Sequence, residues 1–383
     1  MNKHLLYKEL EEWYEVNHRI LPWRETDDPY KIWISEIILQ QTRVAQGMEY
    51  YHRLITRFPD IQSLADAEED EVLLYWQGLG YYSRARNLHK AAQLMKNHEL
   101  FKLNNNNINN VATESTPSVA KGMTSELLNS EQIFSALKSM PGVGDYAAGA
   151  IASFAFDLPY PALDGNVYRV LSRLYDCEIA FDTTQGKKHF RQLAEELLDR
   201  EHPRLFNSAI MELGALHCVP TAPDCPNCPL NTWCKALANN TVELLPVRKP
   251  RPKVRDRYLE YTIYITPEMT TLIHQRKGND IWKHLWEFPL EETTKSFLPS
   301  IGTANLQRSD LPSTGIADLQ RSDLSLTHVL SHQKLHARFV IKNVPELPEI
   351  PDTLVVSLND LDNYAFSRLT LNAIEKLLIP HHS

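Results

Sequence analysis

The sequence predicts two domains of different fold class: an all-α half, residues 1–238, and a smaller α+β domain, residues 258–383. Apolar residues recur at helical spacing throughout the first half, where the alternation typical of strands is scarce. After a basic stretch that contains prolines, runs rich in β-branched and aromatic residues follow. Four clustered cysteines near the end of the first half add a metal centre to the expected architecture.

Nine segments of the first half have apolar residues at the spacing of a helix. They are residues 5–16, 30–45, 62–76, 84–97, 131–138, 146–156, 166–176, 187–199 and 205–216. Asp28 and Pro29 precede the second segment and are typical of a helix start, with proline at the first helical position. Residues 101–130 are polar, rich in asparagine and aperiodic, which predicts an exposed, mobile insertion.

The second half begins with a linker, residues 239–257, in which three prolines are mixed with lysines and arginines. Strands are predicted over 258–267, 270–277 and 337–344. Between them lies a second polar insertion, residues 294–326, which contains the near-duplicates ANLQRSDL and ADLQRSDL. Two copies are too few for a solenoid, so we interpret them as a duplicated loop.

Composition sets the expected compartment. No apolar run is long enough to span a membrane, and the amphipathic, acidic start is not typical of a secretory signal. The few cysteines, clustered as ligands, indicate a reducing compartment, and we expect a cytoplasmic, nucleoid-associated protein. The net charge of −8 argues only weakly against a polyanionic partner, because local patches matter more than the total.

The four cysteines are spaced as Cys218-x6-Cys225-x2-Cys228-x5-Cys234. Cys177 is the only other cysteine, so a structural disulfide network is not expected. Structural zinc sites usually use two close pairs of ligands, whereas this run contains a single close pair. The uneven spacing therefore favours a four-thiolate [4Fe–4S] cluster, with zinc as the alternative.

A Pro-Gly-Val-Gly turn, residues 141–144, lies between two predicted helices. Gly142, Val143 and Gly144 would expose backbone N–H groups at the start of the second helix, where a phosphate oxygen can approach closely. Such a hairpin holds a nucleic-acid backbone without reading its sequence. Asp164, in the segment LDGNVYRVL, stands at another expected helix start. It is either an ordinary N-cap or a carboxylate kept ionised by the helix dipole, suited to stabilising a cationic transition state.

The PGVG hairpin, the LDGNVYRVL segment and the cysteine run, in this order, resemble the endonuclease III superfamily of DNA glycosylases. Within it, the closer match is to MutY-type adenine DNA glycosylases, which remove adenine mispaired with 8-oxoguanine. LPWR at 21–24, WISEIILQQTRV at 33–44 and GLGYYSRARNL at 78–88 are similar to the same family. The resemblance covers nearly all of residues 1–238 and is weaker beyond 258.

The resemblance implies an all-α helix–hairpin–helix glycosylase core with one [4Fe–4S] cluster, followed by an α+β Nudix-like domain. The core would comprise a six-helix lobe at roughly 22–138 and a cluster lobe made of 1–21 and 139–238. The implied partner is double-stranded DNA containing adenine opposite 8-oxoguanine or guanine, bound by a monomer.

The resemblance also assigns catalytic roles. Glu36 would be the general acid that protonates adenine, and its apolar sequence neighbours would raise its pKa and keep the proton available. Departure of the base leaves an oxocarbenium-like sugar, which Asp164 would stabilise or trap, as in glycoside hydrolysis. Tyr146 and Asn166 would position these groups and the water. Tyr146 stands where bifunctional relatives carry a Schiff-base lysine, so base excision without efficient strand cleavage is expected.

To reach the glycosidic bond the enzyme must flip adenine out of the duplex. By resemblance, Gln41 and Tyr81 would wedge into the base stack near 8-oxoguanine. Arg24 and Arg84 would contribute positive charge to DNA binding. The loop between the first two cluster cysteines lacks the basic residue that many relatives carry there, so these other cations are needed.

In the second domain, IWKHLWEFP at 281–289 is similar to a motif of the Nudix-like domain of MutY-type enzymes. No glutamate-dense REUxEE pattern follows it, so this domain is expected to recognise a nucleotide rather than to hydrolyse one. Ser331 and His332 lie where relatives carry the Phe-Ser-His loop that contacts 8-oxoguanine, and Leu330 replaces the phenylalanine.

The sequence disfavours three other functions. Tyr146 and the added second domain argue against an endonuclease III-like glycosylase/lyase that acts on oxidised pyrimidines. The missing glutamate pattern argues against a Nudix hydrolase fused to a DNA-binding module. Glu36 and Asp164 argue against an iron–sulfur protein that only binds DNA.

Overall fold

The structure of the protein is a computed structural model, and it divides into two compact units. The described residues are 2–101, 128–250, 254–293 and 323–378. We call Met1–Asp66 with Asn87–Pro250 the helical unit, and Ala67–Arg86 with Arg251–Ser383 the mixed unit. Most of the two predicted insertions, 101–130 and 294–326, falls outside the described residues.

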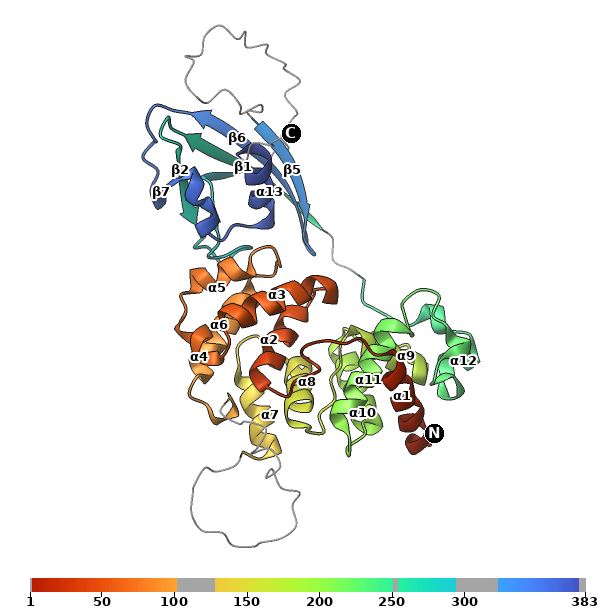
Figure 1. The fold of residues 1–383 in the computed structure, drawn as a ribbon. Helices are drawn as coiled ribbons and strands as arrows, with labels where there is room; N and C mark the ends of the chain where they lie inside the picture. Colours follow the sequence, from red (N-terminus) through yellow and green to blue (C-terminus); the bar gives the residue numbers. More distant parts are fainter. Residues whose placement is uncertain (1, 102–127, 251–253, 294–322, 379–383) are drawn as a thin grey trace, which may run out of the picture. The chain divides into compact units, whose positions relative to one another are not determined.

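The described residues of the first half contain helices and no strand, as predicted for 1–238 (Figure 1). The helices are α1 (Lys3–Asn17), α2 (Pro29–Leu39), α3 (Val44–Arg57), α4 (Ile61–Asp66), α5 (Glu69–Trp76), α6 (Ser83–Met95), α7 (Ser130–Ser139), α8 (Asp145–Phe156), α9 (Gly165–Tyr175), α10 (Thr184–Leu197), α11 (Pro203–Leu216) and α12 (Lys235–Asn239). Of these, α5 lies in the mixed unit and α6 begins there. None of the described helices is long and apolar enough to cross a membrane.

Two of the predicted helices are divided in the structure. The segment predicted at 30–45 ends as α2 at Leu39, and α3, which the sequence analysis missed, begins at Val44. Gln41 between them has a φ of 63°, in the left-handed region, which an apolar spacing pattern does not reveal. The segment predicted at 62–76 consists of α4 and α5, separated near Glu68, the N-cap of α5.

Two central helices position the candidate active site. Helix α2 begins as predicted, with the Asp28 carboxylate accepting from the N–H groups of Tyr30 and Lys31. All but two of its residues are buried, which is typical of a central helix. Helix α8 packs against it and is buried from Ala147 to its end. A Cβ at Gly149 would lie 2.4 Å from the Pro161 carbonyl oxygen, so glycine permits a close approach of backbone there.

A second core forms around α9, α10, α11 and α1 of the helical unit. Leu6, Leu171, Phe190 and Leu213 are buried in it. Cys218 and Cys228 pack against the edge of the same core. The cysteine run is therefore attached to the helix that Asp164 begins.

The C-terminal part of the mixed unit contains two sheets. Their strands are β1 (Arg255–Ile265), β2 (Thr270–Gln275), β3 (Trp286–Glu287), β4 (Leu290–Thr293), β5 (Asp323–Val329), β6 (Gln333–Asn343) and β7 (Thr353–Ser357). One sheet has the order β4-β1-β6-β5, with β1 and β6 parallel, and the other has the order β3-β2-β7. Helix α13 (Arg368–Leu377) packs against the four-stranded sheet (Figure 1).

Alternation along β1 decides which face of that sheet is buried. Leu259, Tyr261, Ile263 and Ile265 point into one core together with Phe339 of β6. The three predicted strands are confirmed as β1, β2 and β6, whereas β3, β4, β5 and β7 were not predicted, and β5 begins at Asp323 within the segment predicted as an insertion. Exposed and partly buried residues alternate along β5, which has no fully buried residue, and Val356 is the one buried residue of β7.

Candidate active site, metal centre and DNA contacts

Glu36 on α2 is a buried carboxyl group in the helical unit, with 1% of its surface exposed. The Tyr146 hydroxyl donates a hydrogen bond to its Oε2 at 2.6 Å, and a guanidinium nitrogen of Arg24 lies 3.9 Å from its Oε1. Burial raises the pKa of Glu36, while Arg24 and the Tyr146 hydrogen bond act in the opposite direction. The predicted direction of the pKa shift is therefore confirmed, although the cause is full burial of α2 and not only sequence neighbours.

Asp164 is the N-cap of α9. Its Oδ1 accepts hydrogen bonds from the backbone N–H groups of Asn166 at 2.9 Å and Val167 at 2.7 Å. The side-chain amide of Asn166 donates to Oδ2 at 2.7 Å. Burial nevertheless raises the pKa of Asp164 above its usual value, and the three hydrogen bonds limit that rise. Asp164 is therefore the N-cap that the sequence predicts, and its burial, which opposes ionisation, was not predicted.

Tyr146 lies close enough to both carboxylates to interact with them. The pKa of its phenol is raised well above the usual value. Burial is the largest cause, and the negative charges of Glu36 and then Asp164 add to it. The phenol is therefore a neutral hydrogen-bond donor. The structure thus brings together Glu36, Tyr146 and Asp164, which are far apart in the sequence. Asn166, the fourth predicted catalytic residue, contacts this group through its hydrogen bond to Asp164.

Arg169 holds Asn166 in place, and the sequence analysis missed it. One guanidinium nitrogen donates to Asn166 Oδ1 at 2.9 Å and to the Gly214 carbonyl at 2.6 Å. Its Nε donates to the Cys218 carbonyl at 2.7 Å. Gly214 allows this approach, because a Cβ there would lie 2.7 Å from the Asn166 Cβ. These contacts connect the Asp164 helix start to the first cysteine of the run.

The Pro-Gly-Val-Gly hairpin forms between α7 and α8 as predicted. Gly142 has a φ of 81°, and a Cβ there would lie 2.9 Å from Asn87 Cβ, so glycine is required. Gly144 is the N-cap of α8 and offers no side chain to its first N–H groups. Asp145 in that first turn pairs with Lys138 and Arg191, which offsets its negative charge.

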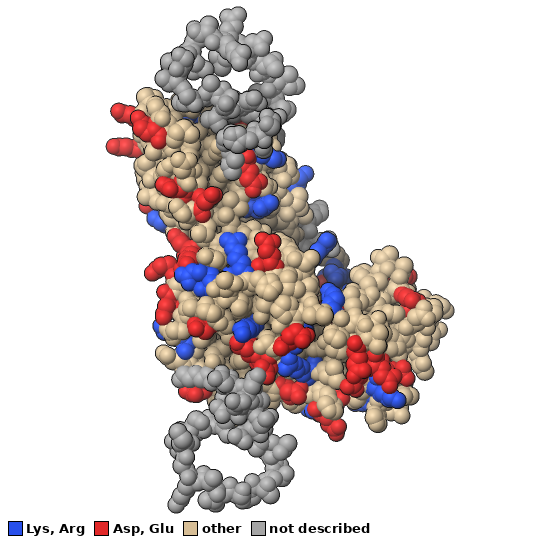
Figure 2. Space-filling view, viewed as in Figure 1, with Lys and Arg blue, Asp and Glu red and all other residues tan. Residues whose placement is uncertain are grey.

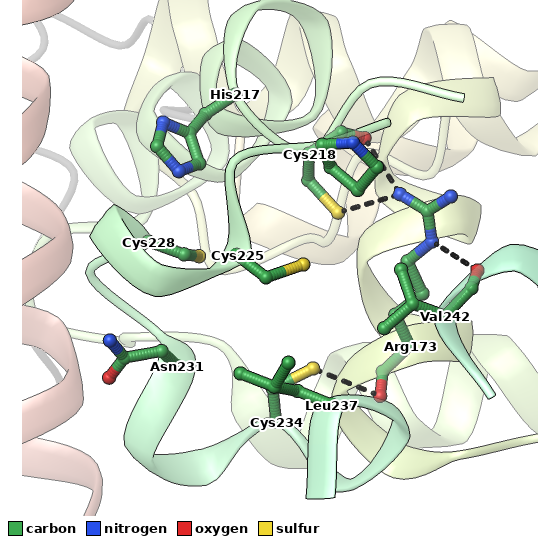
Figure 3. Close-up of a pocket in the computed structure, with 10 residues that line it drawn as sticks. Arg173, His217, Cys218, Cys225, Cys228, Asn231, Cys234, Leu237 and Val242 are labelled. Carbon is green, nitrogen blue, oxygen red and sulfur yellow. Dashed lines mark hydrogen bonds between the residues drawn. The ribbon is translucent and has the colours of Figure 1, made fainter. Parts of the chain in front are cut away.

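The four cysteines line one small pocket with Arg173 and His217 (Figure 3). A guanidinium nitrogen of Arg173 lies 3.3 Å from Cys218 Sγ and donates to the Val219 carbonyl at 2.8 Å. Burial raises the pKa of Cys228 to about 12, so deprotonation there requires a positive partner such as a metal. Across the described residues, no three His, Cys, Asp or Glu side chains converge closely enough to hold one ion. All four thiol groups line this one space, and four cysteine sulfurs are a donor set that fits the predicted metal centre.

Gln41 and Tyr81, the predicted wedge residues, share two features, each within its own unit. Both are exposed, Tyr81 by 50%, and both have left-handed backbone conformations, with φ of 63° and 48°. Such conformations are uncommon for residues other than glycine and often mark functional sites.

Arg84 is buried in the mixed unit. Burial lowers its pKa to about 10, and it donates to the Gly80 carbonyl at 3.3 Å and lies over the rings of Trp76 and Tyr81. In this structure Arg84 therefore supports the turn that carries Tyr81. A phosphate contact by Arg84 stays a prediction. Positive and negative side chains are intermixed on the face of the molecule in Figure 2, so no uniform basic patch on that face identifies the DNA contacts.

Ser331 and His332 form the exposed tip of the β5–β6 hairpin. The backbone N–H of Leu330 donates to the Gln333 carbonyl at 2.8 Å and closes the turn. Ser331 Oγ lies 3.2 Å from His332 Nδ1, so the two polar groups are adjacent and accessible.

Comparison with known proteins identifies the family. Residues 34–200 match the HhH-GPD superfamily of base excision DNA repair proteins, and residues 261–376 match the NUDIX domain. An adenine DNA glycosylase of Buchnera aphidicola (subsp. Baizongia pistaciae) is 34% identical over 292 residues, covering 74% of this chain and 73% of that protein. The chain belongs to the adenine DNA glycosylase family.

A Schizosaccharomyces pombe adenine DNA glycosylase is 29% identical over 427 residues, covering 94% of this chain and 86% of that protein. A solved structure of a thermostable thymine-DNA glycosylase shares the fold, with a TM-score of 0.50 and 22% identity, over 62% of this chain and 97% of that one. The predicted family and fold class are confirmed. As a member of the adenine DNA glycosylase family, the protein is a DNA-binding hydrolase of N-glycosyl bonds in base excision repair.

A partly buried ion pair was also not predicted from the sequence. The Arg19 guanidinium donates to both carboxylate oxygens of Glu212 on α11, at 2.6 and 2.8 Å, and the Arg19 N–H donates at 3.0 Å. The partners are 193 residues apart, so no local pattern could reveal the pair. It fixes the segment before α2, which carries Arg24.

Proposed function

We propose that the protein excises adenine opposite 8-oxoguanine or guanine by base flipping and a two-carboxylate mechanism, without efficient strand cleavage. The observation that carries this proposal is the fully buried Glu36 carboxyl group, bonded to the Tyr146 hydroxyl at 2.6 Å. Burial raises the pKa of Glu36 and so favours the protonated carboxyl that a general acid needs.

Geometry suggests which oxygen of Glu36 carries the proton. Because the Tyr146 hydroxyl donates to Oε2, the proton would reside on Oε1 and pass from there to N7 of the flipped adenine. Arg24, 3.9 Å from Oε1, would then stabilise the carboxylate that remains. Protonation makes adenine a better leaving group.

Departure of the base leaves positive charge on the sugar, and the Asp164 carboxylate would stabilise that charge. Three hydrogen bonds favour the ionised form of Asp164 and fix its orientation before the reaction begins. The water that completes hydrolysis would be positioned by Asn166, which Arg169 holds. Tyr146 cannot replace the lysine of lyases, because a phenol forms no imine with the sugar.

We further propose that Cys218, Cys225, Cys228 and Cys234 hold one [4Fe–4S] cluster. When bound, the cluster would supply four iron–sulfur bonds that tie the 218–234 loop together. Arg173, through its hydrogen bond to Cys218 Sγ, would stabilise that sulfur as a thiolate.

The remaining proposals concern substrate recognition. Ser331 and His332 would contact 8-oxoguanine, Gln41 and Tyr81 would occupy the gap left by the flipped base, and a monomer would bind the duplex. The divisions at 1–238, 239–257 and 258–383 remain our proposal for the evolutionary domains.

The experiment uses the full-length protein with three duplexes that carry adenine opposite 8-oxoguanine, guanine or thymine. We expect excision to be fastest opposite 8-oxoguanine, slower opposite guanine and absent opposite thymine. Strands should break only after alkali treatment. Excision that is equal for all three duplexes would contradict the substrate assignment, and strand breaks without alkali, with a borohydride-trapped complex, would contradict the monofunctional mechanism.

A further inference from the structure

The turn that carries Tyr81 has an unusual backbone. It lies between α5 and α6, and Gly78, Gly80 and Tyr81 have φ angles of 95°, 76° and 48°. Two of these residues are glycines, which adopt such angles freely, but Tyr81 does not. Surrounding contacts must therefore hold the turn in this conformation.

Two side chains next to the turn bind its backbone. Trp76 Nε1 donates to the Gly80 carbonyl at 3.0 Å. The Tyr82 hydroxyl accepts from the Gly78 N–H at 3.1 Å. Each bond connects a side chain that flanks the turn to the backbone of a glycine within it. These bonds stabilise the backbone conformation of the turn.

The residues on either side of the turn, Gln77 and Tyr82, both bind Phe366, which lies in the C-terminal part of the mixed unit. On one side, Gln77 Oε1 accepts from the Phe366 N–H at 2.7 Å. On the other, the Tyr82 hydroxyl donates to the Phe366 carbonyl at 3.2 Å. The main chain of Phe366 is thus bonded through both of its polar groups to the two residues that bracket the turn.

Phe366 is itself fixed by the motif at 281–289. It forms a parallel β-bridge with Trp286, whose N–H donates to the Ala365 carbonyl at 2.8 Å. Its ring, which is buried, stacks on Phe288 with a centroid distance of 6.0 Å. A continuous series of contacts therefore runs from the Nudix-like sheet to the wedge turn.

We propose that Phe366 is the anchor of the wedge turn, so that the Nudix-like domain promotes base flipping in addition to reading the opposite base. Gln77 and Tyr82 are then positioning residues, which act through the backbone conformation of Tyr81. This inference rests on the proposed wedge role of Tyr81. Its physical basis is preorganisation: a wedge held in its inserted conformation before binding does not lose conformational freedom on insertion.

The test compares isosteric substitutions in the full-length protein. Gln77→Met removes the acceptor for the Phe366 N–H but keeps the length of the side chain, whereas Gln77→Glu keeps an acceptor oxygen. Gln275→Met is the matched control, because the Gln275 amide donates to Asp70 at 2.8 Å and to the His284 carbonyl at 3.0 Å, and neither acceptor is a residue of the turn or Phe366. Tyr82→Phe removes the second bond to Phe366 together with the acceptor for the Gly78 N–H, so the Gln77 variants are the ones that isolate the contact with Phe366.

Base extrusion is measured by the fluorescence of 2-aminopurine in place of the target adenine, with Glu36→Gln present to prevent excision. Single-turnover excision of adenine is measured with Glu36 intact. We expect Gln77→Met and Tyr82→Phe each to lower the fluorescence gain and to slow excision about tenfold, the effect of one lost buried hydrogen bond. Gln77→Glu should restore both signals, and Gln275→Met should match the wild type.

The outcomes separate this inference from the proposed function. Wild-type fluorescence gain and rate in both Gln77→Met and Tyr82→Phe would overturn the anchor while leaving adenine excision intact. Equal defects in Gln77→Met, Gln77→Glu and Gln275→Met would also overturn it, because they would reflect general loosening. Failure of the otherwise unmodified protein to extrude or excise adenine in any duplex would instead overturn the proposed function.

Discussion

Replacement of Asp164 by asparagine separates catalysis from folding. The asparagine side chain would keep an oxygen in place for the two backbone N–H groups that donate to Asp164 Oδ1, at 2.9 and 2.7 Å, so the start of α9 would keep its cap. The substitution removes the negative charge. It also turns an NH2 group towards the Asn166 amide, whose orientation Arg169 fixes at 2.9 Å.

The magnitudes follow from these contacts. One lost hydrogen bond between buried groups costs about 1 kcal/mol of the free energy of unfolding. Loss of a preorganised electrostatic contact to the transition state costs about 10²–10³ in rate. We therefore expect Asp164→Asn to fold nearly as well as the wild type and to excise adenine at least about a hundredfold more slowly.

The assay combines single-turnover excision opposite 8-oxoguanine, thermal unfolding and duplex binding. Asp164→Ala is the matched control, since it removes both the charge and the cap and should lose about 1 kcal/mol more stability from the cap alone. A rate for Asp164→Asn within about tenfold of the wild type would refute the electrostatic role. A loss of duplex binding as large as the loss of rate would refute it as well.

Three other predictions concern the remaining sites. Tyr146→Phe removes a hydrogen bond that lowers the pKa of Glu36, so that pKa should rise and the alkaline limb of the pH–rate profile should move to higher pH; an unmoved limb would contradict the general-acid role. Cys225→Ser should lose iron and folding stability, and stoichiometric zinc without iron in freshly prepared wild type would exclude the cluster. Ser331→Ala with His332→Ala should reduce the preference for 8-oxoguanine over guanine while excision opposite guanine persists; an unchanged preference would place recognition elsewhere.

The sequence by itself determined the features that depend on neighbouring residues. The N-caps Asp28 and Asp164 were predicted correctly, because a cap is a contact between a side chain and N–H groups two or three residues away. The hairpin at 141–144 was predicted for the same reason, since glycine encodes its backbone conformation locally. The family likewise follows from the spacing of short motifs.

Only the tertiary structure decided which groups share an environment. Tyr146 meets Glu36 across 110 residues, and Arg19 meets Glu212 across 193, because α8 and α11 pack against distant parts of the chain. The breaks in the helices predicted at 30–45 and 62–76 escaped notice, because the apolar pattern continues across them. Burial of Glu36, and with it the raised pKa, depends on how whole helices pack, and no local sequence pattern specifies such long-range contacts.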